Sequence, residues 1–159
     1  MPNVYAIALG SNRPHGRYGA PAKVIAAALE ALRERGITIR RVAPTFATAP
    51  LGPSERRFAN SAALIETPLA PPALLSLLKE TERAFGRRRG RRWGARVLDI
   101  DIILWSGGAW HDRRLAIPHR QLAHRAFVLD PLACIAGDWR IPGTALRVRH
   151  LRARLEKAA

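Results

Sequence analysis

The chain has 159 residues, a formal net charge of +15 and a hydrophobic fraction of 48%. This length suits a single domain over residues 1–159, and the hydrophobic fraction is typical of a protein with a buried core. The lone Cys134 excludes an intramolecular disulfide. Because we also find no membrane-spanning run and no signal peptide, we expect a cytoplasmic protein. The positive charge favours anionic partners: nucleic acid, acidic lipid or a phosphorylated small molecule.

The first half of the chain alternates short apolar runs with one helical segment. Residues 4–9 form an apolar run that ends at Gly-Ser-Asn, which predicts a buried strand and a turn. The spacing of apolar side chains predicts a helix over residues 20–35, with Gly36 as its C-cap. Residues 37–46 and 58–65 are predicted to be two further strands, joined by a loop that contains two prolines and a glycine.

The second half begins with a predicted helix from Pro71 to Gly86. Glu82 is expected to lie off its apolar stripe, near the C-terminal end. Residues 97–104 are rich in Val, Leu and Ile and therefore predict a fourth strand, which we place at the centre of the sheet. The apolar stripe of the helix consists of Leu74, Leu75, Leu78, Thr81 and Phe85.

The remaining residues predict a C-terminal addition. A glycine-rich turn over residues 105–109 indicates a hairpin, with residues 110–117 returning as an edge strand. A short helix is predicted from Pro131 to Ala136, and residues 146–157 are predicted to form a basic surface segment, helical at least in part. The whole order predicts an α+β, ferredoxin-like βαββαβ antiparallel sheet with both helices on one face, followed by a C-terminal hairpin and short helices.

Two carboxylates share one face of the fourth predicted strand. Because side chains alternate along a strand, Asp99 and Asp101 lie on one face and the neighbouring aliphatic residues face the helices. Their Cα atoms are about 6.6 Å apart, at roughly 3.3 Å per residue. Like charges this close favour a bound cation, and Mg²⁺ completed by substrate phosphates is the natural candidate. The aliphatic residues are Leu98, Ile100, Ile102 and Leu104.

An arginine-rich stretch over residues 87–96 directly precedes these acids. Guanidinium groups bind phosphate in bidentate fashion, so this combination indicates phosphoryl-type transfer. An arginine run alone is more often a solvated face or a nucleic-acid patch. The pattern Arg-x-x-Asp-x-Asp, preceded by Trp93 and Gly94, is much more specific and favours a chemical role.

The stretch from Trp93 to Ile103 resembles the signature of the 6-hydroxymethyl-7,8-dihydropterin pyrophosphokinases of folate biosynthesis, although the family usually has proline where Ala95 stands. The resemblance implies a ferredoxin-like fold and transfer of pyrophosphate from ATP to the hydroxymethyl group of the pterin, with release of AMP. It also implies two Mg²⁺ ions, with ATP as co-substrate. Further matches are residues 8–12, Pro118-His119 and Arg125-Ala126-Phe127.

The resemblance assigns site residues by position. The catalytic set is Arg87, Arg96, Asp99 and Asp101, of which the two aspartates hold the metal. The pterin-binding set is Thr48, Ala49, Leu51, Phe58, Asn60, Trp93 and Phe127. The ATP-binding set is Glu82, Arg89, Trp93, Arg96, Ile102, Arg114, His119 and Arg125.

Within these sets, Phe58 and Phe127 are expected to stack on the two faces of the pterin, and the amide of Asn60 to read its pyrimidine edge. Residues 87–93 are expected to form a mobile lid that orders when both substrates are bound. Glu82 has an equally good alternative role as an i,i+4 partner of neighbouring arginines.

An RNA-binding module is the alternative from another class, because a ferredoxin-like sheet and a charge of +15 both suit RNA. Asp99 and Asp101 would repel a phosphate backbone in the absence of metal, which favours the enzyme. We therefore expect small-molecule substrates, ATP and a reduced pterin, with no nucleic-acid or membrane partner, and a monomer.

Overall fold

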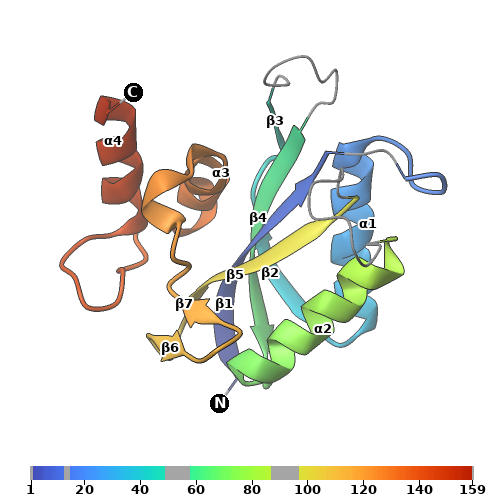
Figure 1. Cartoon of the computed structure of the whole chain (residues 1–159), viewed down its shortest axis with the longest axis horizontal. Helices are drawn as coiled ribbons and strands as arrows, with labels where there is room; N and C mark the ends of the chain where they lie inside the picture. Colours follow the sequence, from blue (N-terminus) through green and yellow to red (C-terminus); the bar gives the residue numbers. More distant parts are fainter. Residues whose placement is uncertain (1, 13–14, 49–57, 87–96, 159) are drawn as a thin grey trace.

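The computed structural model describes residues 2–12, 15–48, 58–86 and 97–158 (Figure 1). Its main sheet has the strand order β2-β4-β1-β5, and β3 pairs with one end of β4. Every pairing in this sheet is antiparallel, as predicted. The strands are β1 (Asn3–Ser11), β2 (Thr38–Val42), β3 (Phe46–Thr48), β4 (Phe58–Thr67) and β5 (Asp99–Trp105).

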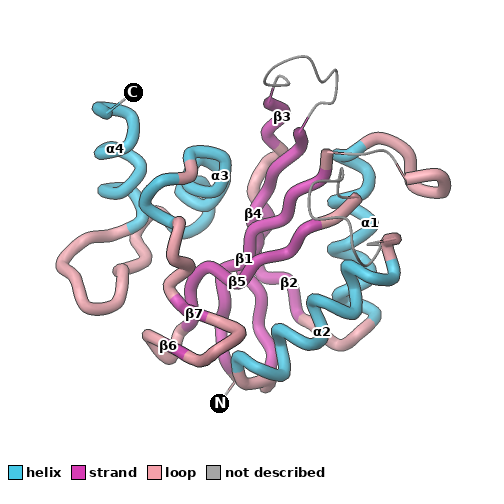
Figure 2. Tube along the Cα trace, in the orientation of Figure 1, coloured by secondary structure: helices cyan, strands magenta, loops and turns pink. Residues whose placement is uncertain are grey.

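Two helices, α1 (Pro21–Glu34) and α2 (Pro71–Ala84), pack on one face of the sheet and enclose the larger hydrophobic core (Figure 2). Each helix begins with a proline, where the missing N–H removes no hydrogen bond. Gly36 follows α1 with a φ of 88°, the left-handed conformation that commonly ends a helix. The order of elements and the position of both helices confirm the predicted ferredoxin-like arrangement.

Strand β5 lies at the edge of the main sheet, because within that sheet it pairs with β1 alone, so the predicted central position is wrong. Ala6 pairs with Leu104, but the next residue, Ile7, pairs with Ile102. Ile103 is therefore an extra residue, a β-bulge that reverses the alternation beyond it. Ile102 packs under α1 and α2, whereas Leu104 packs on the opposite face. The prediction that Leu104 shares the face of Ile102 is wrong for this reason.

Helices α3 (Ala126–Ala136) and α4 (Val148–Ala158) lie on the other side of the sheet and build a second core (Figure 1). A short 3-10 turn, η1 (Leu122–His124), leads into α3, which packs against β4 and β1. The sheet residues of this second core include Ala62 and Leu64, whereas Phe58 at the start of β4 is 40% exposed. One end of this sheet face is therefore left open for a ligand.

Two predicted strands are divided in the structure. Residues 37–46 form β2 and the start of β3, separated around Pro44, which has no N–H for the ladder. Residues 110–117 form β6 (Trp110–His111) and β7 (Ala116–Ile117), which pair with each other and do not extend the main sheet. The C-terminal hairpin is thus present, but as a separate two-stranded sheet.

The predicted start of the short helix is also wrong, because Pro131 lies inside α3. Val128 and Leu129 are buried in the second core, and this packing extends the helix toward its N-terminus despite the proline. The helical segment predicted over residues 146–157 is confirmed by α4. Among the residues that the structure describes, no helix is long and apolar enough to cross a membrane.

Candidate active site

One row of paired residues crosses the open end of the sheet. Asn60 on β4 pairs with Gly10 on β1, and Gly10 pairs with Asp99 on β5. A Cβ at Gly10 would lie 3.2 Å from Asn60 Oδ1, so the amide occupies the space that glycine leaves empty. Asn60 itself is only 8% exposed. The glycine thus leaves room for the Asn60 amide on the face of the sheet that also carries Asp99.

The second carboxylate lies one strand repeat away on the same face. Asp101 pairs with Ala8, which packs against the second core, and Asp99 is two residues before it without an intervening bulge. Both aspartates are half-buried. The predicted shared face of Asp99 and Asp101 is therefore confirmed, and it is the face opposite α1 and α2.

Two exposed aromatic side chains come from this side of the molecule. Phe58 at the start of β4 is 40% exposed, and Phe127 in the first turn of α3 is 45% exposed. The guanidinium carbon of Arg125 lies 5.6 Å from the centre of the Phe127 ring, a cation–π contact. Large aromatic side chains left this exposed are available to stack on a flat ligand.

His119 interacts electrostatically with one of the carboxylates and with Arg125. Desolvation lowers the pKa of His119; the negative charge of Asp101 opposes this shift, and the positive charge of Arg125 adds to it. The backbone N–H of His119 donates to the Ile103 carbonyl at 3.1 Å, and the N–H of Gln121 donates to His119 Nδ1, also at 3.1 Å. Neutral His119 therefore carries its proton on Nε2, which can donate to a ligand.

A pocket of about 440 Å³ runs around the outer edge of β5. Asp101 and Ile102 both line it, although their side chains lie on opposite faces of the sheet. Ile102 is only 2% exposed as a whole residue, so it offers a ligand little accessible surface of its own. The remaining lining comes from α2, the β6–β7 hairpin and the segment after it, including Leu75, Lys79, Arg114, Leu115, His119 and Arg120.

A tight turn positions Arg114 at this pocket. Asp112 Oδ1 accepts hydrogen bonds from the N–H groups of Arg114 at 2.7 Å and Leu115 at 2.9 Å. Asp112 Oδ2 accepts one from Trp110 Nε1 at 2.8 Å. The Trp110 hydrogen bond and then that of Arg114 lower the pKa of Asp112, so the carboxylate stays charged and the turn stays closed. Sequence analysis missed this role of Asp112, although an aspartate that accepts from backbone N–H groups two residues on is common in turns.

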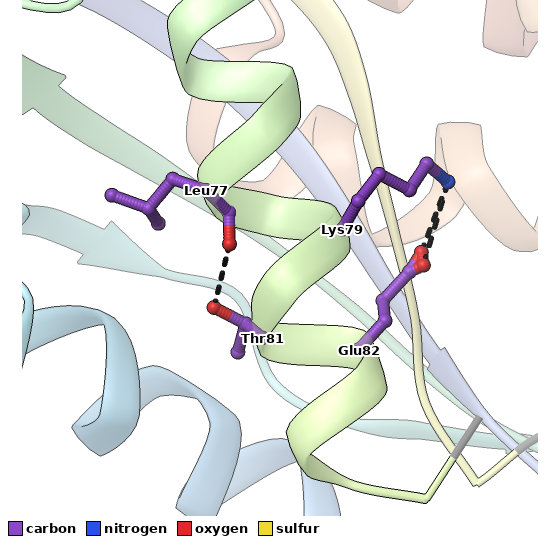
Figure 3. A network of polar contacts seen from close by, with 4 residues as sticks. All are labelled: Leu77, Lys79, Thr81 and Glu82. Carbon is purple, nitrogen blue, oxygen red and sulfur yellow. Dashed lines mark hydrogen bonds and ion pairs between the residues drawn. The ribbon is translucent and has the colours of Figure 1, made fainter.

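Glu82 is buried, and the prediction that it lies off the apolar stripe of α2 is wrong. Its side chain is 0% exposed. Lys79 Nζ donates to Glu82 Oε1 at 3.0 Å and to Oε2 at 3.4 Å (Figure 3). The two side chains thus form an i,i+3 ion pair, while the neighbouring arginines over residues 87–92, the expected partners of Glu82, lie outside the part of the chain that the structure describes. Lys79, which sequence analysis missed, also lines the pocket.

Several predicted site residues lie outside the part of the chain that the structure describes, together with the predicted lid over residues 87–93. Thr48 is the last residue of β3 and pairs with Phe58. The structure brings Asn60, Asp99, Asp101, His119 and Arg125 to one side of the sheet, as the site prediction requires. The residues outside the description are Ala49, Leu51, Arg87, Arg89, Trp93 and Arg96.

The donor set of Asp99 and Asp101 suits a hard divalent cation. Mg²⁺ is commonly held by one or two carboxylates and completed by substrate phosphates and water, so it does not need a cage of protein ligands. Among the described residues, no cluster of three or more His, Cys, Asp or Glu side chains could hold a metal ion without such help. A metal at these aspartates would therefore depend on a phosphate ligand.

Comparison with known proteins agrees with this arrangement. The family model of 7,8-dihydro-6-hydroxymethylpterin-pyrophosphokinase (HPPK) matches residues 6–137. A 2-amino-4-hydroxy-6-hydroxymethyldihydropteridine pyrophosphokinase of Methylorubrum extorquens is 41% identical over 143 residues, which cover 89% of this chain and 87% of that protein. A protein of the same name from Pseudomonas aeruginosa is 42% identical over 138 residues, covering 86% and 82%.

The fold agrees as well. The crystal structure of Plasmodium falciparum HPPK-DHPS superimposes with a TM-score of 0.75 over 97% of this chain and 41% of that longer chain, at 13% sequence identity. This likeness concerns the fold, whereas the family match rests on the sequence over most of the chain. The resemblance first seen between Trp93 and Ile103 is thereby confirmed. The chain belongs to the 7,8-dihydro-6-hydroxymethylpterin-pyrophosphokinase (HPPK) family.

Proposed function

We propose that this protein transfers the β,γ-diphosphate of ATP to the hydroxymethyl oxygen of 6-hydroxymethyl-7,8-dihydropterin and releases AMP, a step of folate biosynthesis. The observation that carries the proposal is the shared face of Asp99, Asp101 and Asn60 beside a pocket of about 440 Å³. The names of the relatives from M. extorquens and P. aeruginosa support the same reaction.

The reaction exchanges one P–O bond for another. The hydroxymethyl oxygen of the pterin attacks the β-phosphorus and forms a new O–P bond. The bond from the β-phosphorus to the oxygen bridging to the α-phosphate breaks, and its electron pair leaves with AMP. The hydroxyl proton passes to solvent. The protein must therefore align two substrates and neutralise the charge on the transferred group.

Asp99 and Asp101 would hold Mg²⁺, and we propose two ions, as in the family that the chain resembles. When bound, the metal neutralises phosphate charge and lowers the cost of deprotonating the hydroxyl. The negative charge of Asp101 also opposes the desolvation that lowers the pKa of His119, whose Nε2–H can donate to a phosphate oxygen. Arg87, Arg89 and Arg96 are proposed to contact the phosphates on the strength of the resemblance alone.

The pterin is proposed to stack between Phe58 and Phe127. Both rings are exposed, and Arg125 over Phe127 orients that ring. The Asn60 amide both donates and accepts, which suits the pyrimidine edge of the pterin. Main-chain groups of Thr48, Ala49 and Leu51, together with Trp93, complete this site by resemblance.

ATP is proposed to occupy the pocket around the edge of β5. Its base would lie against Ile102 at the edge of β5, and Arg114, His119 and Arg125 would contact the phosphates. Glu82 would act indirectly, because its side chain is fully buried. We further propose a single domain, a monomer, a cytoplasmic location and no nucleic-acid partner.

The proposal is tested by incubating the protein with ATP, Mg²⁺ and 6-hydroxymethyl-7,8-dihydropterin and separating the products by chromatography. We expect AMP and the pterin diphosphate ester in equal amounts. Stoichiometric ADP would instead show an ordinary kinase. Product formation without the pterin would indicate a nucleotide hydrolase.

A further inference from the structure

The tip of the β6–β7 hairpin is not fixed by strand pairing alone. β6 and β7 have two residues each and form a separate two-stranded sheet. A hairpin of this size is marginally stable in water by itself. Its tip nevertheless carries Arg113 and Arg114, both of which line the pocket at the edge of β5. Contacts outside the strand pairing therefore have to hold the tip in place.

Trp110 anchors the base of the hairpin to the main sheet. Its ring meets the ring of Trp105, the last residue of β5, edge-on, with the centroids 6.0 Å apart and an angle of 81° between the planes. Trp105 in turn stacks on Tyr5 of β1 at 6.5 Å, and its Nε1 donates to Asn3 Oδ1 at 3.2 Å. Both tryptophans pack against the larger hydrophobic core. The position of the Trp110 indole is therefore set by β1 and β5.

One carboxylate connects this indole to the tip. Trp110 Nε1 donates to Asp112 Oδ2 at 2.8 Å, and Asp112 Oδ1 accepts from the N–H groups of Arg114 and Leu115. The N–H of Asp112 donates to the Leu115 carbonyl at 3.0 Å, which closes the turn. Asp112 thus links the anchored indole directly to the backbone of Arg114.

The turn fixes the backbone of Arg114 and leaves its head group available. Arg114 is exposed, and its guanidinium forms no hydrogen bond or ion pair with any residue that the structure describes. The pKa of Asp112 is lowered most by the indole hydrogen bond and less by the positive charge of Arg114, so the carboxylate acts mainly on the turn. An arginine whose backbone is already fixed loses less conformational freedom on binding a phosphate.

We propose that Trp110 and Asp112 are positioning residues for ATP, which hold the backbone of Arg114 at the pocket so that its guanidinium reaches the phosphates from a fixed origin. This inference rests on the proposed ATP-dependent function. Both residues act through Arg114 and not by direct contact with the nucleotide. Their replacement should therefore weaken ATP binding without affecting the pterin.

The test measures the KM for ATP and the dissociation constant of ATP with Mg²⁺ in three variants. Trp110→Phe keeps an aromatic ring but lacks the indole donor. Asp112→Asn keeps an oxygen for the two backbone N–H groups but cannot accept from the indole, and Asp112→Ala loses all three hydrogen bonds. We expect both constants to rise about threefold to fivefold in the first two variants and about tenfold in the third, since one hydrogen bond is worth about fivefold net.

The same measurements show whether the effect is specific to ATP. We expect kcat and the KM for the pterin to stay unchanged in all three variants. Trp139→Phe is the matched control, because Trp139 packs against the second core and does not line the pocket. It should leave every constant unchanged. An equal rise in the KM for ATP and for the pterin would overturn the proposal, because it would show a general loss of structure.

The direction of the change in Asp112→Asn separates positioning from simple charge. This substitution removes a negative charge beside the binding site of a polyanion, which by itself strengthens ATP binding. Positioning predicts weaker binding instead. A lower dissociation constant for ATP in Asp112→Asn would therefore overturn the proposal.

Arg114→Ala tests whether the effect passes through this arginine. In the Arg114→Ala background, Asp112→Ala should cause no further loss of ATP affinity, because its route to the nucleotide is already removed. A full additional loss would overturn the proposal. Trp110→Phe takes the place of Asp112→Ala in this cycle if a thermal melt shows that the latter is unfolded. A wild type that binds ATP but forms no AMP would overturn the proposed function, whereas the dissociation constants would still decide the positioning role.

Discussion

The close approach of Gly10 to the Asn60 amide makes a strong prediction about substrate binding. Replacing Gly10 with alanine places a Cβ 3.2 Å from Asn60 Oδ1, where ordinary contacts are 3.4–4 Å. The amide must therefore retreat by a few tenths of an ångström. Asn60 is only 8% exposed, so neighbouring groups limit how it can adjust. The substitution should displace the amide without unfolding the strand.

The expected magnitude follows from the hydrogen bonds that the amide makes to the pterin. Each is worth about 1 kcal/mol net, and a partial loss of two gives about 1.4 kcal/mol, or roughly tenfold in affinity. Alanine in a strand regains roughly 0.5–1 kcal/mol of the stability that glycine loses, and this offsets the tight contact. We therefore expect Gly10→Ala to raise the KM for the pterin about tenfold, with a thermal midpoint close to that of the wild type.

Steady-state kinetics with varied pterin and saturating ATP measure this effect, and a thermal melt measures stability. Gly16→Ala is the matched control, because no atom lies within 4 Å of a Cβ built there. If Gly10→Ala leaves the pterin KM unchanged, Asn60 is not the residue that reads the pterin. If both glycine variants raise it equally, the effect is not local to the row of Asn60, Gly10 and Asp99.

Three further outcomes are expected. Asp99→Ala and Asp101→Ala should each lower kcat about a hundredfold or more. The melting temperature in chelator should stay unchanged or rise, because a like-charge pair is removed. A large drop in that temperature would show a structural role of the aspartates instead. Phe127→Ala should raise the pterin KM roughly threefold to tenfold through lost stacking, with little change in stability, since the ring is 45% exposed; an unchanged KM would exclude the stacking role. Burial raises the pKa of Tyr5 to about 12, so the unfolded chain loses this proton first, near pH 10. The stability that Tyr5 contributes below pH 10 should fall as the pH rises toward 12. Chemical denaturation at pH 9 and 11 should therefore show a smaller decrease in the free energy of unfolding for Tyr5→Phe than for the wild type. An equal decrease in the variant would show that other groups cause it.

Local rules in the sequence determined much of the fold. The prolines at 21 and 71 and the glycine at 36 mark helix ends, because they act on the backbone within one turn. The alternation of Asp99, Ile100 and Asp101 fixes their faces, because a strand has a period of two wherever it is regular. The candidate metal ligands could therefore be predicted before any contact was known.

Features that depend on contacts between elements could be established only from the tertiary structure. The bulge at Ile103 arises from pairing with β1 and turns Leu104 to the other face, which the alternation of β5 alone does not reveal. Glu82 is buried within α2, although a glutamate side chain ordinarily favours solvent. The proximity of His119, Arg125 and Asp101 likewise depends on how the segment after β5 returns over the sheet. Sequence spacing sets the direction of each side chain along its own element, but packing between elements sets which groups meet.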